Sequence, residues 1–162
     1  MKKCVAAALA IFVLFFSLFS CGGKPEGARD LLGSLLSLVE DLPAGGCYAT
    51  TPRAKDQVLD ARLTESLYRR SDGYLEYEGR VAEAAVYLGS APDPFFEAAV
   101  FVCYGNADTR AVVEMCMRRA RLIEAHHAAF LGDIALSVSG RVVAYVIARD
   151  TEAAQGVLDR LF

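Results

Sequence analysis

The sequence predicts an α+β domain in which helices pack on an antiparallel sheet of about four strands. Two observations lead to this prediction. Apolar residues recur at helical spacing in several stretches, and two other stretches each hold a pair of strand-like apolar segments joined by a short turn. The predicted order is helix, helix, β-hairpin, helix, β-hairpin, helix.

A Leu-rich helix is expected first, from Ala28 to Leu42, where Pro43 and two glycines end it. Residues 47–62 mix Thr, Pro and charged side chains, which predicts an irregular connection. Thr64 is then expected to cap a short helix that runs to Arg70. These two helices need apolar partners, which the following strands can supply.

The first hairpin is predicted from Arg80 to Leu88 and from Phe95 to Tyr104, with a Pro-containing loop between the strands. One face of this hairpin is expected to be partly polar and aromatic. It is the candidate binding surface, and it consists of Glu83, Tyr87, Glu97 and Phe101.

A long amphipathic helix is expected from an Asp108 cap to about Leu131, closed by Gly132. Its apolar residues fall on one side. Its charged residues are expected to form a solvent-exposed face with pairing along the helix. These charged residues are Arg110, Glu114, Arg118, Arg119 and Arg121.

The second hairpin is predicted from Asp133 to Val138 and from Arg141 to Arg149, with Ser139-Gly140 as the turn. Asp150 or Thr151 is expected to cap a final helix that ends at Leu161. Alternation along the two strands predicts one apolar face. It consists of Ile134, Leu136, Val143, Tyr145 and Ile147.

Residues 1–20 have the pattern of a secretory signal. Lys2 and Lys3 form a basic head, and the apolar run from Val5 to Phe19 is shorter than the roughly 20 residues that a spanning helix needs. Cleavage after Ser20 leaves 142 of the 162 residues, which suffices for one domain.

The end of this signal, Leu18-Phe19-Ser20-Cys21, resembles the lipobox of bacterial lipoproteins. The resemblance implies that the Cys21 thiol is acylated and that Cys21 becomes the N-terminus of a membrane-anchored, extracytoplasmic protein. The small polar stretch up to Gly27 then serves as a flexible linker to a single domain, residues 28–162. The alternative is an ordinary secreted protein in which Cys21 is free or disulfide-bonded.

The succession of segments also resembles a group of short bacterial lipoproteins that are catalogued as a domain of unknown function. The resemblance implies a small lipid-anchored α+β domain with no known activity and no functional residues to transfer. Besides the lipobox and the helices, the segments that carry it are Leu63–Arg69, Ala84–Leu88, Phe96–Phe101 and Val142–Ile147.

The charge of the chain bears on its partners. Lys2 and Lys3 leave with a signal that has no acidic residue, so the net charge changes from −3 to −5. A mildly acidic surface argues against nucleic acid and against anionic lipid as the main partner.

Three cysteines belong to the domain, so at least one thiol is unpaired in a monomer. Cys103 and Cys116 lie in apolar runs, which favours two buried free thiols. A disulfide between Cys103 and Cys116 is the alternative, and Cys47 has no assigned partner.

The chain contains few groups suited to catalysis. His126 and His127 are adjacent on one predicted helix and diverge by about 100°, so they need distant partners to bind a metal. The six-residue loop from Gly89 to Pro94 could bring Glu83 and Glu97 together for acid–base chemistry or for a hard cation. No Gly-x-Ser-x-Gly, phosphate-loop or His-Glu-x-x-His pattern is present in the sequence.

The function expected from these observations is a non-catalytic binding or interaction module at the cell envelope. It is held to the membrane by its lipid, needs no cofactor, and has an envelope protein or peptide as its possible partner. One alternative is a small envelope hydrolase or metal-dependent enzyme that uses Glu83, Glu97 or His126. The other is a purely structural lipoprotein, and pairing of two copies through a strand edge is open.

Overall fold

The computed structural model describes residues 27–90, 95–126 and 134–162. The predicted signal, Cys21 and most of the linker lie outside the described residues. The described part contains a five-stranded antiparallel sheet with the order β1-β2-β3-β5-β4. The strands are β1 (Gly45–Ala49), β2 (Val81–Gly89), β3 (Glu97–Cys103), β4 (Ile134–Ser139) and β5 (Val142–Ile147).

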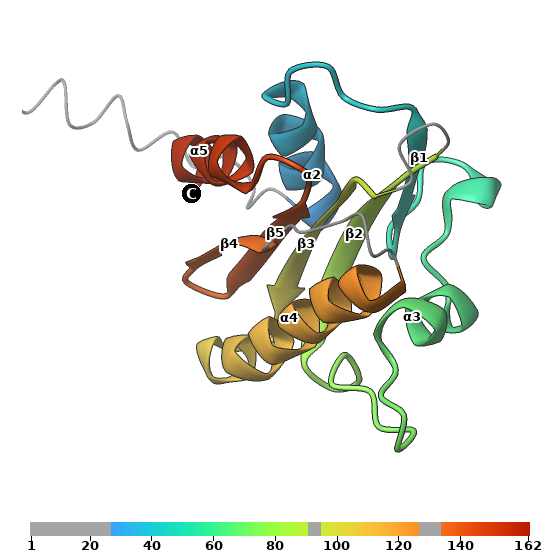
Figure 1. The fold of residues 1–162 in the computed structure, drawn as a ribbon. Coiled ribbons are helices and arrows are strands. Elements are labelled where there is room, and N and C mark those ends of the chain that lie inside the picture. The colour runs from blue at the N-terminus through green and yellow to red at the C-terminus, as the bar shows by residue number, and fades with distance from the viewer. Residues whose placement is uncertain (1–26, 91–94, 127–133) are drawn as a thin grey trace, which may run out of the picture.

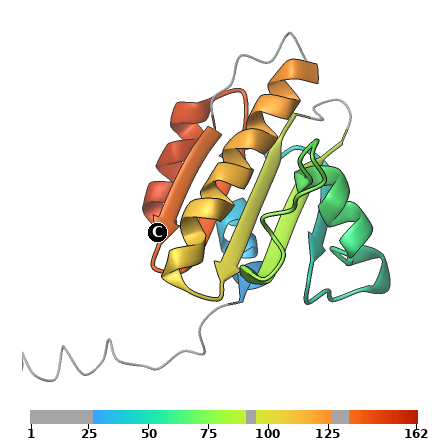
Figure 2. The same cartoon turned by 90° about the horizontal axis from the view of Figure 1, so that it is seen from below.

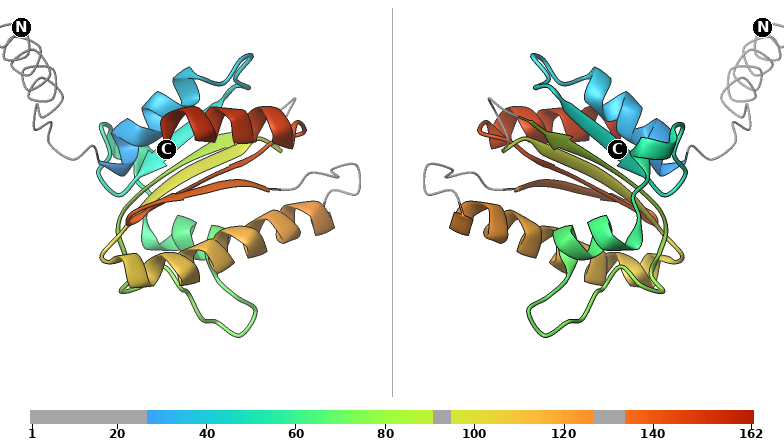
Figure 3. Two further views of the ribbon diagram at one scale, coloured as in Figure 1. Left: turned by 90° about the vertical axis from the view of Figure 1, so that its left-hand side faces the viewer. Right: turned by 90° about the vertical axis from the view of Figure 1, so that its right-hand side faces the viewer.

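Helices cover both faces of this sheet and make three layers (Figures 1 and 3). The helices α2 (Ala28–Ser37) and α5 (Thr151–Leu161) pack on one face, which we call the α2/α5 face. The helices α3 (Ala61–Tyr68) and α4 (Thr109–His126) pack on the other, the α3/α4 face. Figure 2 shows α4 running along the strands with α3 beside it. Two short 3-10 helices, η1 (Lys55–Gln57) and η2 (Asn106–Asp108), complete the elements.

The predicted α+β class with an antiparallel sheet is confirmed, and the sheet has one strand more than the predicted four. The additional strand, β1, lies at the start of the stretch that we expected to be irregular. Cys47 pairs with Tyr87 and Ala49 with Ala85, so the strand depends on partners that lie 40 and 36 positions away. A Cβ atom at Gly45 would lie 2.3 Å from the Leu88 carbonyl oxygen, so only glycine permits this close approach.

Both early helices differ in detail from the prediction. The helix α2 ends at Ser37 rather than Leu42, and Asp41 adopts a left-handed φ of 52°, which turns the chain away. The helix α3 is capped by Asp60, whose carboxylate accepts a hydrogen bond from the Leu63 amide at 2.7 Å. Thr64 therefore lies inside the helix and is buried, and its hydroxyl donates to the Asp60 carbonyl.

The predicted long helix is confirmed from Thr109 to His126, and its expected extension to Leu131 lies outside the described residues. Asp108 does not cap it directly. The Asp108 side chain accepts a hydrogen bond from the Gly105 amide and closes η2 instead.

The second hairpin has the predicted apolar face with a different turn. Ser139 pairs with Val142, so Gly140 and Arg141 form the turn, and Gly140 has a φ of 56°. The pair that closes the turn is thus Ser139 with Val142 instead of Val138 with Arg141, a shift of one residue along each strand. The predicted side chains therefore remain together on one face. That face packs into the α3/α4 core. The final helix also starts as predicted, because the Asp150 carboxylate accepts from the Ala153 amide at 2.9 Å.

The strand β3 lies at the centre of the sheet and is buried along its whole length, on both faces. Alternate residues of β3 belong to the two cores. Ala98 and Val100 contribute to the α2/α5 core, whereas Ala99 and Phe101 contribute to the α3/α4 core. Every residue of β3 therefore meets a helix layer.

Candidate functional site

The four residues of the predicted binding surface do not share a face, so that prediction is wrong. The β2–β3 register pairs Ala84 with Phe101 and Leu88 with Glu97, which joins even-numbered residues to odd-numbered ones. Directly paired residues point to the same side of a sheet. Glu97 and Phe101 therefore lie on the α3/α4 face, and the odd-numbered Glu83 and Tyr87 of β2 lie on the opposite one.

Glu83 and Tyr87 have structural contacts on the α2/α5 face. One carboxylate oxygen of Glu83 accepts a hydrogen bond from the Ala28 amide at 3.2 Å, at the start of α2, where Gly27 offers no side chain to cap the helix. The Tyr87 hydroxyl donates to the Pro43 carbonyl, and its ring meets the Phe96 ring edge-on at 5.9 Å. Both residues thus fix the segment around α2 to the sheet.

Glu97 is a buried carboxylate, with 3% of its surface exposed. The Arg119 guanidinium donates to both of its oxygens, at 3.1 Å from Nε and 2.6 Å from Nη2, and the Tyr145 hydroxyl donates to Oε1. The Tyr68 and Tyr145 hydroxyls are 2.9 Å apart. Burial, together with the negative charge of Glu97, raises the pKa of both tyrosines well above its usual value.

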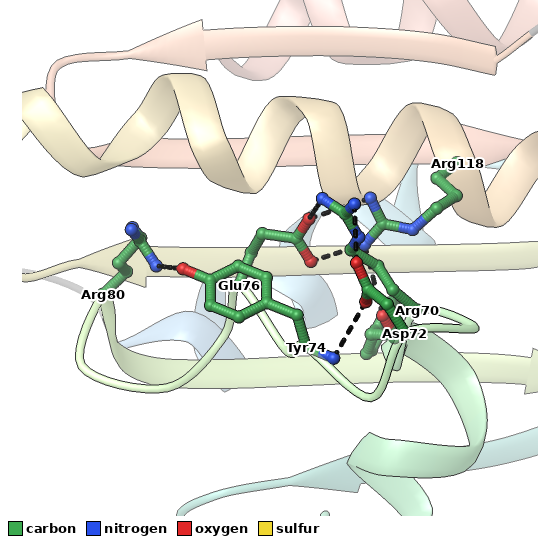
Figure 4. Close-up of polar contacts among 7 residues, drawn as sticks. Arg70, Asp72, Tyr74, Glu76, Arg80 and Arg118 are labelled. Carbon is green, nitrogen blue, oxygen red and sulfur yellow. Dashed lines mark hydrogen bonds and ion pairs between the residues drawn. The ribbon is translucent and has the colours of Figure 1, made fainter.

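A second buried carboxylate, Glu76, lies in the loop between α3 and β2 (Figure 4). Arg118 from α4 donates a hydrogen bond to each of its carboxylate oxygens, at 2.9 and 2.5 Å. The Arg70 Nη1 atom lies 3.7 Å from Glu76 Oε1. Arg70 and Arg80 also lie over the Tyr74 ring, at 5.8 and 5.9 Å from its centre. These contacts hold the loop against α4.

The predicted solvent face of the long helix is therefore wrong at two positions. Arg118 and Arg119 reach buried carboxylates, which their spacing along α4 does not reveal. Arg110 and Glu114 behave as predicted and form an exposed pair at 3.5 Å.

The three thiols of the domain are free, so the alternative of a Cys103–Cys116 disulfide is wrong. Cys103 and Cys116 are buried, as the favoured prediction had it. Burial, with a contribution from Asp108, raises the pKa of Cys103 to about 11, and burial also raises that of Cys116 well above its usual value. Both thiols are therefore protonated and unreactive at neutral pH.

His126 is the last residue of α4, and His127 lies outside the described residues. Within the described ranges, no three His, Cys, Asp or Glu side chains gather as metal ligands. Glu83 and Glu97, the predicted acid–base pair, are separated by the sheet.

The α2/α5 face contains a pocket of about 570 Å³, within the size range of small-ligand sites. It lies between the end of α2 and the helix α5, above β3 and β5. Its lining is largely apolar and comes from the turn after α2, from Phe96 just before β3, from β5 and the residues that follow it, and from α5. The main apolar residues are Leu38, Val39, Phe96, Val146, Ala148 and Val157.

Charged residues of both signs line the same pocket. Glu40 and Asp41 come from the turn after α2, and Arg149 and Arg160 come from the end of β5 and from α5. Asp150 also lines it, but its carboxylate already caps α5. The lining thus includes acidic and basic residues, and the guanidinium of Arg149 lies over the Phe95 ring, which packs against the α3/α4 core.

This pocket was not predicted, because residues 38–41 were expected to lie inside the first helix. One signal could have indicated it. Gly156 lies in the middle of α5, where glycine costs roughly 1 kcal/mol relative to alanine. A Cβ atom there would meet nothing within 4 Å, and Gly156 lines the pocket.

No family model, curated protein or solved structure matches the chain. The resemblance to a lipoprotein family therefore stays a prediction. Among the described helices, none is both long enough and apolar enough to cross a bilayer.

Proposed function

We propose that the protein is a lipid-anchored, extracytoplasmic binding protein that holds a small ligand without covalent chemistry in the pocket between α2 and α5. The pocket itself carries this proposal. The pocket has a volume of about 570 Å³, and its lining combines apolar side chains with charged groups. This is the usual composition of a site that binds and orients a ligand.

The state of the chemically capable groups favours binding over catalysis. The Glu97 oxygens accept hydrogen bonds from Arg119 and Tyr145. Glu83 accepts a hydrogen bond from the Ala28 amide of α2. The buried thiols are protonated at neutral pH because burial raises their pKa. Of the groups considered for an enzyme, Glu83 and Glu97 thus serve the fold.

The anchor is proposed from the sequence. Cys21 follows a lipobox-like segment, and the six residues from Gly22 to Gly27 span about 20 Å when extended. The domain would therefore remain close to the membrane surface, where several acyl chains give stable attachment. The envelope membrane is its first partner in this proposal.

The binding function is tested with anilinonaphthalene sulfonate, an apolar fluorescent probe that carries one negative charge. We expect the folded protein to bind it with a rise in fluorescence, and Gly156→Leu to abolish the rise because the new side chain fills the pocket. Gly33→Leu is the matched control. It also lies inside a helix with open space around it, but outside the pocket.

The anchor is tested by intact mass and detergent partitioning of the protein purified from its native membrane. We expect a mature N-terminus at Cys21 with an acyl-sized mass increment, and loss of both in Cys21→Ser. A water-soluble, unacylated mature protein would contradict this part of the proposal.

A further inference from the structure

We infer that the pocket binds one hydrocarbon chain of a membrane lipid and leaves the head group of that lipid outside. The inference rests on the proposed binding function and specifies the class of ligand. Its basis is the separation of apolar from charged residues in the lining, together with the small residues that α5 presents along its length. Figures 1 and 3 show α2 and α5 in the layer that forms the pocket.

The inner part of the pocket is apolar. The buried residues of its lining have exposed fractions of 1% to 7%, and the half-buried residues of the lining are apolar as well. Every charged residue of the described lining, in contrast, is exposed. A polar part of a ligand therefore belongs at the mouth of the pocket, and an apolar part belongs inside. The buried lining residues are Phe96, Val146, Ala154 and Val157.

The lining also lacks neutral hydrogen-bonding side chains. Among the described residues that line the pocket, none carries a hydroxyl, amide, imidazole or thiol group. The backbone groups of β5 and α5 are engaged in the sheet and in the helix. Burying a polar group without a hydrogen-bond partner costs free energy, so the inner part is a poor site for a sugar, a nucleotide or a peptide. It is suited to a hydrocarbon.

The helix α5 forms a long, low wall of the pocket. Its lining residues Ala153, Gly156, Val157 and Arg160 are spaced so that they fall on one side of the helix. The seven positions from the first to the last correspond to about 10 Å along the helix axis. A Cβ atom at Gly156 would meet nothing within 4 Å, and Ala153 is also small and exposed. This wall leaves room for a narrow, extended ligand that lies along the helix.

The proposed anchor favours a membrane lipid as the source of the chain. The linker from Gly22 to Gly27 spans about 20 Å when extended. It leads into α2, whose ten residues span about 15 Å and end at the pocket. The pocket therefore stays near the bilayer in this proposal, where acyl chains are the most abundant hydrocarbon. The exposed charges at its mouth have both signs, so they select no particular head-group charge.

The test uses the mature chain with Cys21→Ser, which needs no detergent, and titrates it calorimetrically with alkyl maltosides below their micelle concentrations. We expect the affinity to rise about fourfold for each methylene from hexyl to decyl maltoside, because each added methylene leaves water. Lysophosphatidylethanolamine and lysophosphatidylglycerol with the same chain are expected to bind within threefold of each other. Circular dichroism of each variant checks that the fold is intact.

Two variants locate the chain along α5. Gly156→Leu is expected to weaken decyl maltoside binding at least tenfold, because leucine fills the middle of the wall. Ala153→Leu closes one end, so the gain in affinity from hexyl to decyl maltoside is expected to fall at least tenfold.

Matched controls keep these variants interpretable. Gly33→Leu lies in open space outside the pocket, and Ala61→Leu lies at the exposed start of α3 on the other face, so neither is expected to change binding. Glu40→Gln and Arg160→Gln alter the mouth only and are expected to change decyl maltoside affinity less than threefold.

The outcomes separate this inference from the proposed function. Equal affinity along the maltoside series, with binding of the fluorescent probe still lost in Gly156→Leu, would overturn the hydrocarbon chain and leave the binding pocket. A tenfold loss in Glu40→Gln or Arg160→Gln would overturn it too, because the ligand would then be held by its polar part. Probe binding that is absent, or unaffected by Gly156→Leu, would refute the proposed function itself.

Native mass spectrometry identifies the source of the chain. We expect the acylated protein to retain one added lysophosphatidylethanolamine molecule, as the Cys21→Ser protein does. Retention by the Cys21→Ser protein alone would overturn the separate lipid and assign the pocket to an acyl chain of the protein's own anchor.

Discussion

The two faces of the sheet treat charge in opposite ways. On the α3/α4 face, Glu97 and Glu76 are buried and each is bound by an arginine from α4. On the α2/α5 face, charged residues of both signs stand around an open pocket, and the one strand carboxylate, Glu83, bonds to a helix end. The first face is closed by its polar groups, and the second is left open between its helices.

This difference indicates which face is available for function. A buried ion pair with all its hydrogen bonds satisfied costs a great deal to disrupt, so such a face tolerates little movement or substitution. A pocket with an apolar lining and exposed charges can exchange water for a ligand without breaking the fold. The α3/α4 face therefore serves stability, and the proposed binding site lies on the α2/α5 face.

The largest effect is expected from Glu97→Ala. The change leaves Arg119 and Tyr145 without their shared acceptor, and we expect the free energy of unfolding to fall by about 3 kcal/mol. Urea denaturation at pH 7, followed by circular dichroism, measures it. Glu83→Ala on the other face removes one hydrogen bond and is expected to cost about 1 kcal/mol. Equal losses would contradict the contrast between the faces.

The tyrosine pair is expected to give the next effect. The Tyr145 hydroxyl donates to Glu97 and therefore accepts from Tyr68, so it lies in the middle of a hydrogen-bonded chain. We expect Tyr145→Phe to cost about 2 kcal/mol and Tyr68→Phe about 1 kcal/mol, since the second change removes only the terminal bond. Denaturation of both single variants and of the double variant measures the coupling. A larger loss for Tyr68→Phe would exclude this direction of donation.

Alkaline pH is expected to weaken the α3/α4 face selectively. Cys103 has a raised pKa of about 11 when folded, against 9 for an ordinary thiol, so the folded state keeps a proton that the unfolded state releases. Its contribution is complete below pH 9 and is lost as the pH rises from 9 to about 11. Unfolding by urea across this range measures the decline, and Cys103→Ala should make it less steep, while the raised pKa of Cys116 accounts for part of what remains. An equally steep decline in that variant would assign the effect to other groups.

The smallest effect is a gain of stability on the pocket side. Gly156→Ala adds a methyl group in open space within α5, and we expect a gain of about 0.5–1 kcal/mol from the helix propensity. Thermal unfolding compares it with Gly33→Ala, which is expected to give a similar gain in α2. A loss at position 156 alone would show that the wall of the pocket is closed there.

Much of the fold was predictable because its signals are local. The faces of the second hairpin, the Asp150 cap and the apolar side of α4 follow from residues within a few positions of one another. The face of the first hairpin was predicted wrongly for a local reason too. An even number of residues between the strands pairs even positions with odd ones, so Glu83 and Glu97 cannot meet.

The candidate site was less predictable because its parts are distant in the chain. The pocket joins the turn after α2 to Phe96, β5 and α5, and the prediction extended the first helix through that turn. The left-handed Asp41 that ends this region is permitted by its residue type but not required by it. Gly156, an unfavourable residue inside a helix, is a signal that the sequence offers, but Gly33 in α2 offers the same signal and does not line the pocket.

The sequence by itself determined the α+β class, the two hairpins and the long helix, because hydrophobic periodicity and capping residues act over short ranges. The tertiary structure decided which charges are buried. Arg118 reaches Glu76 across 42 positions and Glu97 joins Tyr145 across 48. It also decided that β1 forms and that a pocket opens beside α5. These features depend on long-range pairing of side chains and strands, which the order of residues along the chain does not display.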